Sequence, residues 1–157
     1  MREKDRIHIL FLCTGNICRS PMAEYIFKDL VEKAGMESGY VIDSAGCSDE
    51  EEGNALYPPA QKVLSEHGIP FGRHRARQVT EEDMRRADHV IVMDDGKMAM
   101  EGTPREVFQR VEELRSIGLT VPDTVDLLDR LQKDDWDVPL DALTVEECAD
   151  AIVSALR

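Results

Sequence analysis

Residues 7–12 form the first largely apolar stretch, in which His8 is the one polar residue. A stretch of this length without regular polar alternation is typical of a strand buried on both faces of a parallel sheet. Residues 40–42 and 89–93 carry the same pattern. The hydrophobic pattern therefore predicts three buried strands.

Between these strands the apolar residues recur at helical spacing. A first helix is expected after the loop at residues 13–19, with Ser20 as its N-cap and Pro21 at its first position. A second helix is expected from residue 58 to Gly68, and a capping box predicts a short third helix after Thr80. Strands alternating with helices indicate an α/β fold with a parallel sheet.

The pattern changes after residue 94. Asp95-Gly96 is a two-residue hairpin signal that reverses the chain after the third strand. Three amphipathic helices are expected to follow, beginning near Thr103, Asp123 and Thr144. We expect these helices to cover the exposed face and edge of the sheet.

The length of 157 residues with 42% apolar content fits one ordinary domain. We therefore expect a single α/β domain over residues 1–157. Within it, residues 1–94 form the core and residues 95–157 form a hairpin with a helical tail.

Charge and cysteine content narrow the location and the partners. Four cysteines, two of them in one loop, favour a reducing compartment, and the cytoplasm is the expected location. No apolar stretch reaches the roughly 18 residues of a membrane span, and no secretion signal is recognised. The net charge of −13 argues against nucleic acid as a partner. The oligomeric state stays open.

The first loop carries the chemistry. Cys13 and Arg19 are separated by five residues, between a buried strand and a helix start. Successive main-chain N–H groups and the helix N-terminus bind a phosphate dianion there, and the same field with the Arg19 cation is expected to hold Cys13 as a thiolate nucleophile. Arg19 supplies paired donors for the phosphoryl oxygens. The other loop residues are expected to bind phosphate: Thr14, Gly15, Asn16, Ile17, Cys18 and Ser20.

This arrangement supports a two-step hydrolysis of a phosphomonoester. Cys13 attacks phosphorus while an acid protonates the leaving oxygen, and water then hydrolyses the cysteinyl phosphate. No metal or other cofactor is required. The alternative is that Cys13 is an ordinary buried core cysteine.

Residues 12–24 closely resemble the signature of low molecular weight protein tyrosine phosphatases, and the resemblance continues to about residue 94. It implies a three-layer sandwich around a central parallel sheet, and phosphotyrosine proteins or small aryl phosphates as substrates. Cys13 matches the family's nucleophile and Arg19 its phosphate-binding arginine. Cys18 matches a cysteine that forms a protective disulfide with the nucleophile, and Ile17 matches the tyrosine-phosphatase form of the loop rather than the arginine-phosphatase form.

Two features leave alternatives open. The family's general acid lies in an Asp-Pro motif, and this sequence has none; Asp137 is the tentative acid and Asp123 the alternative. The basic side chains of residues 74–77 either face an acidic substrate or form a solvated surface.

The segment of residues 87–157 resembles the C-terminal part of energy-coupling factor transporter ATPases, through residues 88–97, 101–108 and 143–148. The chain is therefore a candidate recombinant of two families. The tail has no Gly-x4-Gly-Lys loop and cannot be an ATPase by itself. Two further functions are considered: a phosphate-binding module with little turnover, and a regulatory protein related to transporter ATPases.

Overall fold

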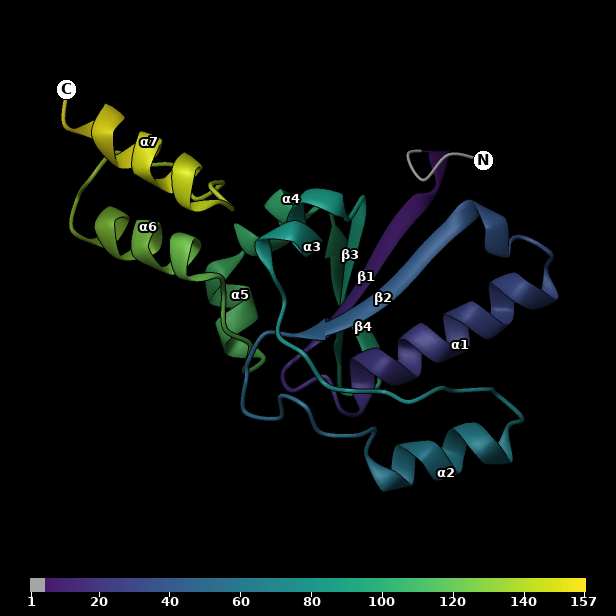
Figure 1. Cartoon of the computed structure of the whole chain (residues 1–157). Helices are drawn as coiled ribbons and strands as arrows, with labels where there is room; N and C mark the ends of the chain where they lie inside the picture. Colours follow the sequence, from purple (N-terminus) through teal and green to yellow (C-terminus); the bar gives the residue numbers. More distant parts are fainter. Residues whose placement is uncertain (1–4) are drawn as a thin grey trace.

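The computed structural model describes residues 5–157 and contains one four-stranded sheet, ordered β2-β1-β3-β4 (Figure 1). The strands are β1 (Ile7–Cys13), β2 (Tyr40–Gly46), β3 (His89–Asp94) and β4 (Lys97–Gly102). β1 pairs in parallel with both β2 and β3, whereas β4 is antiparallel to β3. The carboxyl ends of β1, β2 and β3 therefore meet at one edge of the sheet, and β4 begins there.

The predicted α/β fold is confirmed, with a mixed rather than a purely parallel central sheet. The difference follows from the hairpin at Asp95 and Gly96, which have φ values of 47° and 69°. A two-residue turn of this kind joins only antiparallel strands. The sequence signal for the hairpin was right, and it determines the direction of β4.

One face of the sheet is covered by α1 (Arg19–Lys33), and α2 (Pro58–Glu66) packs beside α1 (Figure 1). Phe11 and Ile42 from the sheet pack against Val31 of α1. A short 3₁₀ helix, Glu37–Gly39, links α1 to β2. Strand residues at alternate positions point to this face, as the pleat of a strand requires.

The opposite face is covered by short helices: α3 (Glu81–Arg86), α4 (Pro104–Phe108) and α5 (Val111–Ser116). They bury the largest apolar cluster of residues 5–157, which joins strand residues such as Leu12 and Val92 to Phe108 and Leu114. Because this cluster contains residues on both sides of residue 94, the first and the second part of the chain share one core.

Two helix boundaries differ from those predicted. The helix expected from Thr103 to Gly118 is broken into α4 and α5 at Arg110, whose ψ of 53° is not helical. α1 begins at Arg19, before the expected N-cap Ser20. The hydroxyl of Ser20 instead hydrogen-bonds within the loop, so it is not available as a cap.

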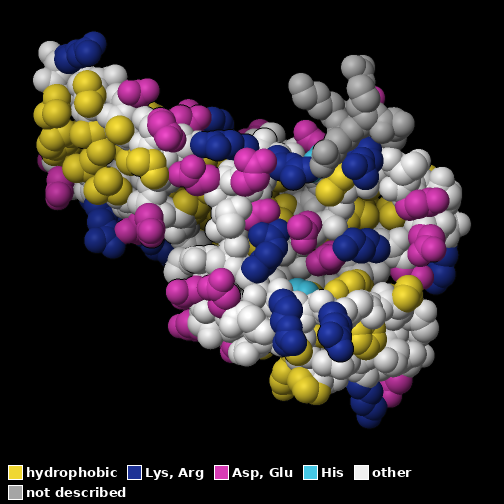
Figure 2. Space-filling view, viewed as in Figure 1, with side chains coloured by type: hydrophobic (Ala, Val, Ile, Leu, Met, Phe, Trp, Pro, Cys, Tyr) yellow, Lys and Arg dark blue, Asp and Glu magenta, His cyan; other side chains and the backbone are white. Residues whose placement is uncertain are grey.

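The last two helices, α6 (Asp123–Lys133) and α7 (Val145–Ala155), pack on each other and extend to the side of the sheet (Figure 1). Only part of α6 reaches the main core, through Val125. Figure 2 shows hydrophobic side chains gathered on this part of the surface. The expectation that all three predicted tail helices cover the sheet therefore holds for the first of them and only partly for the second.

Among residues 5–157, no helix is long and apolar enough to cross a membrane.

Phe108→Ala is expected to lower the free energy of unfolding by about 3–5 kcal/mol, because removal of the fully buried ring leaves a cavity against β3 and β4. Leu156→Ala is the control, since Leu156 is 67% exposed and should change stability by less than about 0.5 kcal/mol. Urea denaturation followed by circular dichroism measures both. Equal stability of the two variants would contradict this description of the core.

Candidate active site

The loop between β1 and α1 lies at the sheet edge where the three parallel strands end. Cys13 is the last residue of β1 and is 2% exposed. The residues that follow β2 pack directly on the loop. Cys47 N donates to the Cys13 carbonyl over 2.9 Å, and Ser48 N donates to the Thr14 carbonyl over 3.0 Å. A Cβ atom at Gly46 would lie 2.7 Å from the Thr14 carbonyl oxygen, so this close approach requires glycine.

The thiol of Cys13 is in contact with a buried hydroxyl. Its Sγ lies 3.1 Å from Ser20 Oγ. Ser20 Oγ also accepts a hydrogen bond of 3.0 Å from Asn16 Nδ2 and lies 3.3 Å from the Ala45 carbonyl. The hydroxyl has one hydrogen, which it donates to the Ala45 carbonyl here and which can turn to the sulfur when Cys13 is ionised. The hydroxyl is therefore placed to donate to a Cys13 thiolate.

Asn16 holds the loop through its side chain and its backbone. It is fully buried and has a φ of 57°, in the left-handed region that asparagine tolerates better than most residues. Its Nδ2 also donates to Ser44 Oγ over 2.9 Å, and its Oδ1 accepts from Arg77 N over 3.1 Å. The Asn16 carbonyl oxygen is 2.6 Å from His74 Nε2. Three separate segments, namely α1, β2 and the segment before α3, are thus tied to one residue.

The sequence pattern did not indicate that Ser44 and Glu24 support this network. Ser44 Oγ donates to Glu24 Oε2 over 2.5 Å, and Glu24 is 6% exposed and paired with Lys28. The only available signal was the run of polar residues at the end of the predicted second strand. Arg77 fits neither open alternative for the basic residues fully, because its partly exposed guanidinium pairs within the chain with Asp83 and with the exposed Asp43.

The pKa values of Arg77 and Asp83 reflect this pairing. The hydrogen bond to Asp83 raises the pKa of Arg77. Burial acts to raise the pKa of Asp83, but hydrogen bonds from Arg77 and Thr80 outweigh it and hold that pKa below its usual value. Both groups stay charged at neutral pH, so the pair fixes the segment that carries Arg77 N to Asn16.

Arg19 reaches the loop from the first turn of α1. Its Nη1 donates to Asp94 Oδ1 over 2.6 Å, and its Nη2 donates to Thr14 Oγ1 over 3.1 Å. Asp94 is the last residue of β3, so the sheet itself positions this carboxylate. A guanidinium has five N–H groups, and the two bonds leave further donors for a phosphate.

The remaining loop residues contact the neighbouring segments. Tyr57 N donates to the Ile17 carbonyl over 2.8 Å. A Cβ at Gly15 would lie 2.9 Å from Glu51 Cγ, so an acidic side chain lies against the loop. Burial raises the pKa of Cys18, and the negative charge of Cys13 raises it further, while Arg19 acts in the opposite direction.

Cys47, a third thiol near the loop, differs from Cys13 in its environment. It is 5% exposed, and burial, with a smaller effect of Cys13, raises its pKa to about 12. Cys47 is therefore a neutral thiol at physiological pH. Its side chain packs in the core, and no side chain among residues 5–157 donates a hydrogen bond to its sulfur.

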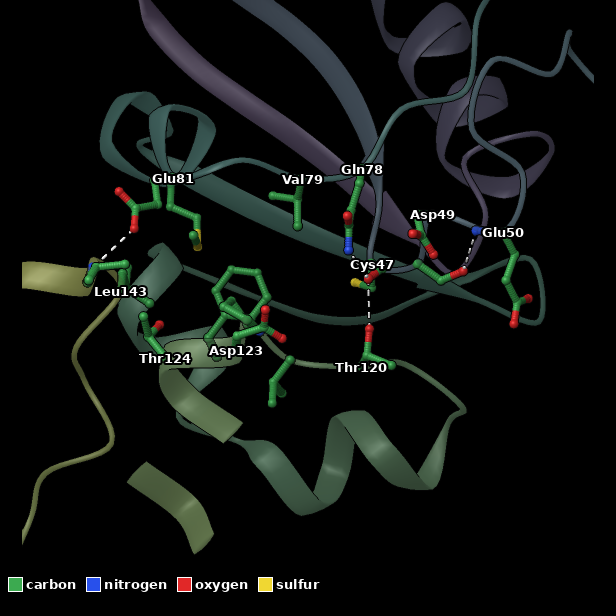
Figure 3. A pocket seen from close by; sticks show the side chains of 16 residues that line it. Cys47, Asp49, Glu50, Gln78, Val79, Glu81, Thr120, Asp123, Thr124 and Leu143 are labelled. Atoms are coloured by element: carbon green, nitrogen blue, oxygen red, sulfur yellow. Dashed lines mark hydrogen bonds between the residues drawn. The ribbon is translucent and has the colours of Figure 1, made fainter. Parts of the chain in front are cut away.

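The two candidate acids lie in different places. Asp137 is exposed and lines a groove together with Arg105 and Glu147. None of residues 13–20 lines this groove. Asp123, at the start of α6, lines a pocket together with Cys47 and Ser48, the residues that hydrogen-bond to the loop backbone (Figure 3). The structure thus brings Asp123, and not Asp137, to the side of the loop.

Residues 5–157 contain no group of three or more histidine, cysteine, aspartate or glutamate side chains arranged to hold a metal ion.

Comparison with known proteins agrees with this geometry. A family model described as low molecular weight phosphotyrosine protein phosphatase matches residues 8–152, a span that contains the loop, the sheet except Ile7, and most of the tail. The chain belongs to this family.

Individual curated relatives align with only part of the chain. The low molecular weight protein-tyrosine-phosphatase YfkJ of Bacillus subtilis is 48% identical over 88 residues, which is 56% of each chain. The low molecular weight phosphotyrosine protein phosphatase of Sus scrofa is 41% identical over 98 residues, 62% of this chain and 61% of its own. The chain thus spans about three fifths of the length of these curated phosphatases.

A solved structure extends the similarity to the tail. The crystal structure of YfkJ from Bacillus subtilis superposes with a TM-score of 0.56 and 33% identity, over 96% of this chain and 89% of that chain. The phosphatase fold therefore accommodates most of the tail.

Asn16→Ala and Asn16→Gly test the loop. Both remove the side-chain hydrogen bonds and should weaken binding of inorganic phosphate, but only alanine is strained at a positive φ. We expect the alanine variant to be less stable than the glycine variant by about 1 kcal/mol. Calorimetric phosphate titration and urea denaturation measure the two effects. Equal stability of the variants would show that the left-handed backbone is not the constraint.

Proposed function

We propose that this chain hydrolyses phosphomonoesters of phosphotyrosine or small aryl alcohols through a cysteinyl-phosphate intermediate. The observation that carries the proposal is the position of Cys13 Sγ at 3.1 Å from Ser20 Oγ, in a loop to which Arg19 also donates. Membership in the phosphatase family supports it.

In the first step, the Cys13 thiolate attacks phosphorus and the bond to the leaving oxygen breaks. Arg19 and the loop N–H groups stabilise the charge on the three non-bridging oxygens, and Asp94 fixes the direction of the guanidinium. In the second step, water attacks the phosphocysteine and releases phosphate. The Ser20 hydroxyl donates to the sulfur when it leaves as a thiolate.

The substrate proposal depends on Ile17 and on the names of the relatives. Ile17 matches the tyrosine-phosphatase form of the loop, and the relatives are described as phosphotyrosine phosphatases. A phosphotyrosine protein or a small aryl phosphate is therefore the proposed substrate. We also propose that the protein is located in the cytoplasm, because its four cysteines are free thiols and two of them lie in the reactive loop.

Asp123 is our proposed general acid. It lines the pocket that adjoins the loop, whereas Asp137 lies in the groove beside Arg105. The acid donates a proton to the leaving oxygen, so its effect depends on how basic that oxygen is. The alternative function is a module that binds phosphate with little turnover because the Asp-Pro motif is missing.

The resemblance of the tail to transporter ATPases leads to a separate proposal, that the chain has mixed ancestry. The limited length of the alignments with curated relatives, 88 to 98 residues, supports it. No structural observation favours a regulatory function related to transporter ATPases.

Cys13→Ser is expected to abolish turnover of para-nitrophenyl phosphate and to retain phosphate binding, because serine removes the nucleophile and keeps the loop backbone. Turnover is measured by absorbance and binding by calorimetry. The parent protein should accumulate a phosphocysteine that acid quenching and mass spectrometry detect. A parent protein that binds phosphate without forming this adduct would favour the binding-module alternative.

Asp123→Asn is expected to slow phenyl phosphate, a poor leaving group, by about 10²-fold or more, and para-nitrophenyl phosphate much less. Asp137→Asn is the matched control and should leave both rates unchanged. Steady-state kinetics with the two substrates gives the comparison. Rates equal to the parent for both variants would mean that neither aspartate is the acid.

A further inference from the structure

The arginine groove, a hollow of about 330 Å³ lined by residues 55–56, 61 and 71–75, lies beside the phosphate loop. One wall is the segment that precedes α2, and the other is the segment that follows it. Leu56, which is 3% exposed, and the half-buried Phe71 belong to the apolar cluster between α1 and α2. The volume is at the lower end of the range of small-molecule sites, so the groove can admit a single side chain.

Both walls of the arginine groove are bonded to the phosphate loop. Tyr57 N, next to Leu56, donates to the Ile17 carbonyl over 2.8 Å. In the other wall, His74 Nε2 lies 2.6 Å from the Asn16 carbonyl oxygen. Because Asn16 and Ile17 are consecutive residues of the loop, the groove has a fixed position next to the proposed phosphate site.

The second wall presents its two arginines outward. Along residues 73–76 exposed and less exposed side chains alternate: Arg73 and Arg75 are exposed, whereas His74 is half-buried and Ala76 is 2% exposed. Ala76 N also donates to the Asn54 carbonyl over 2.8 Å, which fixes this segment. Figure 2 shows basic side chains together on the segment between α2 and α3, with hydrophobic side chains next to them.

No acidic side chain lines the arginine groove. Among residues 5–157, neither Arg73 nor Arg75 forms an ion pair, and the one hydrogen bond of the Arg75 guanidinium goes to the Gly53 carbonyl over 3.3 Å. Glu51 and Glu52 precede Gly53, but neither carboxylate pairs with Arg75, and that of Glu51 accepts from Asn54 Nδ2. The groove is therefore positively charged.

Two neighbouring arginines without carboxylates are unusual in this chain. It has 32 acidic and 19 basic residues, and Arg19, Arg77 and Arg115 are each bonded to a carboxylate. A guanidinium carries five N–H donors in a plane that matches the oxygens of a carboxylate or a phosphate. Arg73 and Arg75 keep these donors available at the side of a site that already binds one anion.

We propose that Arg73 and Arg75 bind an oxyanion group of the substrate, on a residue close to the phosphotyrosine. The apolar part of that residue packs on Leu56 and Phe71. Two sources have this chemistry: the carboxylate of an aspartate or glutamate, and the phosphate of a second phosphorylated residue. The inference rests on the proposed phosphatase function. Of the two alternatives left open for the basic residues, it selects substrate binding for Arg75.

Peptide kinetics tests the groove. One glutamate is moved along an alanine-based phosphotyrosine peptide, on both sides of the phosphotyrosine, and glutamine at the same position is the neutral reference. At the best position glutamate should raise kcat/KM about threefold to fivefold at low salt, as expected for exposed charge pairs. The gain should vanish in about 1 M sodium chloride.

Phosphoserine at the same position distinguishes the two sources. A larger gain in kcat/KM with phosphoserine than with glutamate assigns the groove to a second phosphate. An equal or smaller gain assigns it to a carboxylate.

Arg73→Gln with Arg75→Gln should remove the preference and leave turnover of para-nitrophenyl phosphate unchanged, because this substrate does not extend into the groove. Arg73→Gln alone loses no hydrogen bond within residues 5–157 and should lower the gain without disturbing the contact to Gly53. The control, Arg130→Gln with Arg157→Gln, removes two exposed positive charges outside the groove and should keep the preference.

Calorimetric titration of Cys13→Ser protein with the same peptides measures the groove without turnover. If the native protein hydrolyses nothing, tighter binding of the glutamate peptide that the double variant loses still supports the groove, and only the phosphatase function fails. Normal turnover of para-nitrophenyl phosphate, with equal kcat/KM and equal affinity for all peptides, overturns the groove and leaves the phosphatase function intact. A preference that survives in the double variant also overturns it.

Discussion

The structure of the phosphate loop depends on the hydrogen bonds of one buried amide, that of Asn16. A loop that points successive N–H groups inward must reverse its main-chain direction within a few residues, and a left-handed residue provides this reversal. The amide of Asn16 stabilises it by bonding to Ser20, Ser44 and Arg77 N. The residue thus connects the loop, α1, β2 and the segment before α3. The position of the nucleophile is therefore a property of the whole sheet edge rather than of the loop alone.

The direction of β4 has a second far-reaching effect. Because β4 is antiparallel, it ends at Gly102, beside the amino end of β3, whereas Cys13 lies at the carboxyl end of β1. The chain must pass through α4 and α5 before residues 120–124 return to the loop edge, where Thr120 Oγ1 donates to the Cys47 carbonyl. The same path explains why Asp123 lines the pocket that Cys47 and Ser48 also line, whereas Asp137 lies in a different groove.

Charge is distributed unevenly around this edge. Two cations near the loop are held by carboxylates, Arg19 by Asp94 and Arg77 by Asp83, so that they are fixed in direction. The pocket that Asp123 lines has the reverse arrangement, with carboxylates and no cation. This asymmetry gives the edge a polarity that the net charge of −13 does not describe.

The sequence by itself determined the elements that local chemistry controls. The apolar stretches gave the three parallel strands, Asp95-Gly96 gave the hairpin, and the capping boxes at Thr80, Thr103 and Thr144 form as predicted. The spacing of Cys13 and Arg19 indicated the phosphate loop, because the strand, the loop and the helix follow one another directly in the sequence.

Only the tertiary structure decided which distant residues meet. His74 and Arg77 bind the loop through contacts across more than fifty residues, and no local pattern encodes such contacts. The break at Arg110 and the burial of Ser20 likewise depend on what packs against them. Local propensity fixes how each segment folds. The placement of Asp123 beside the loop and of Asp137 away from it depends on how the tail returns over the sheet, which is a matter of packing between distant segments.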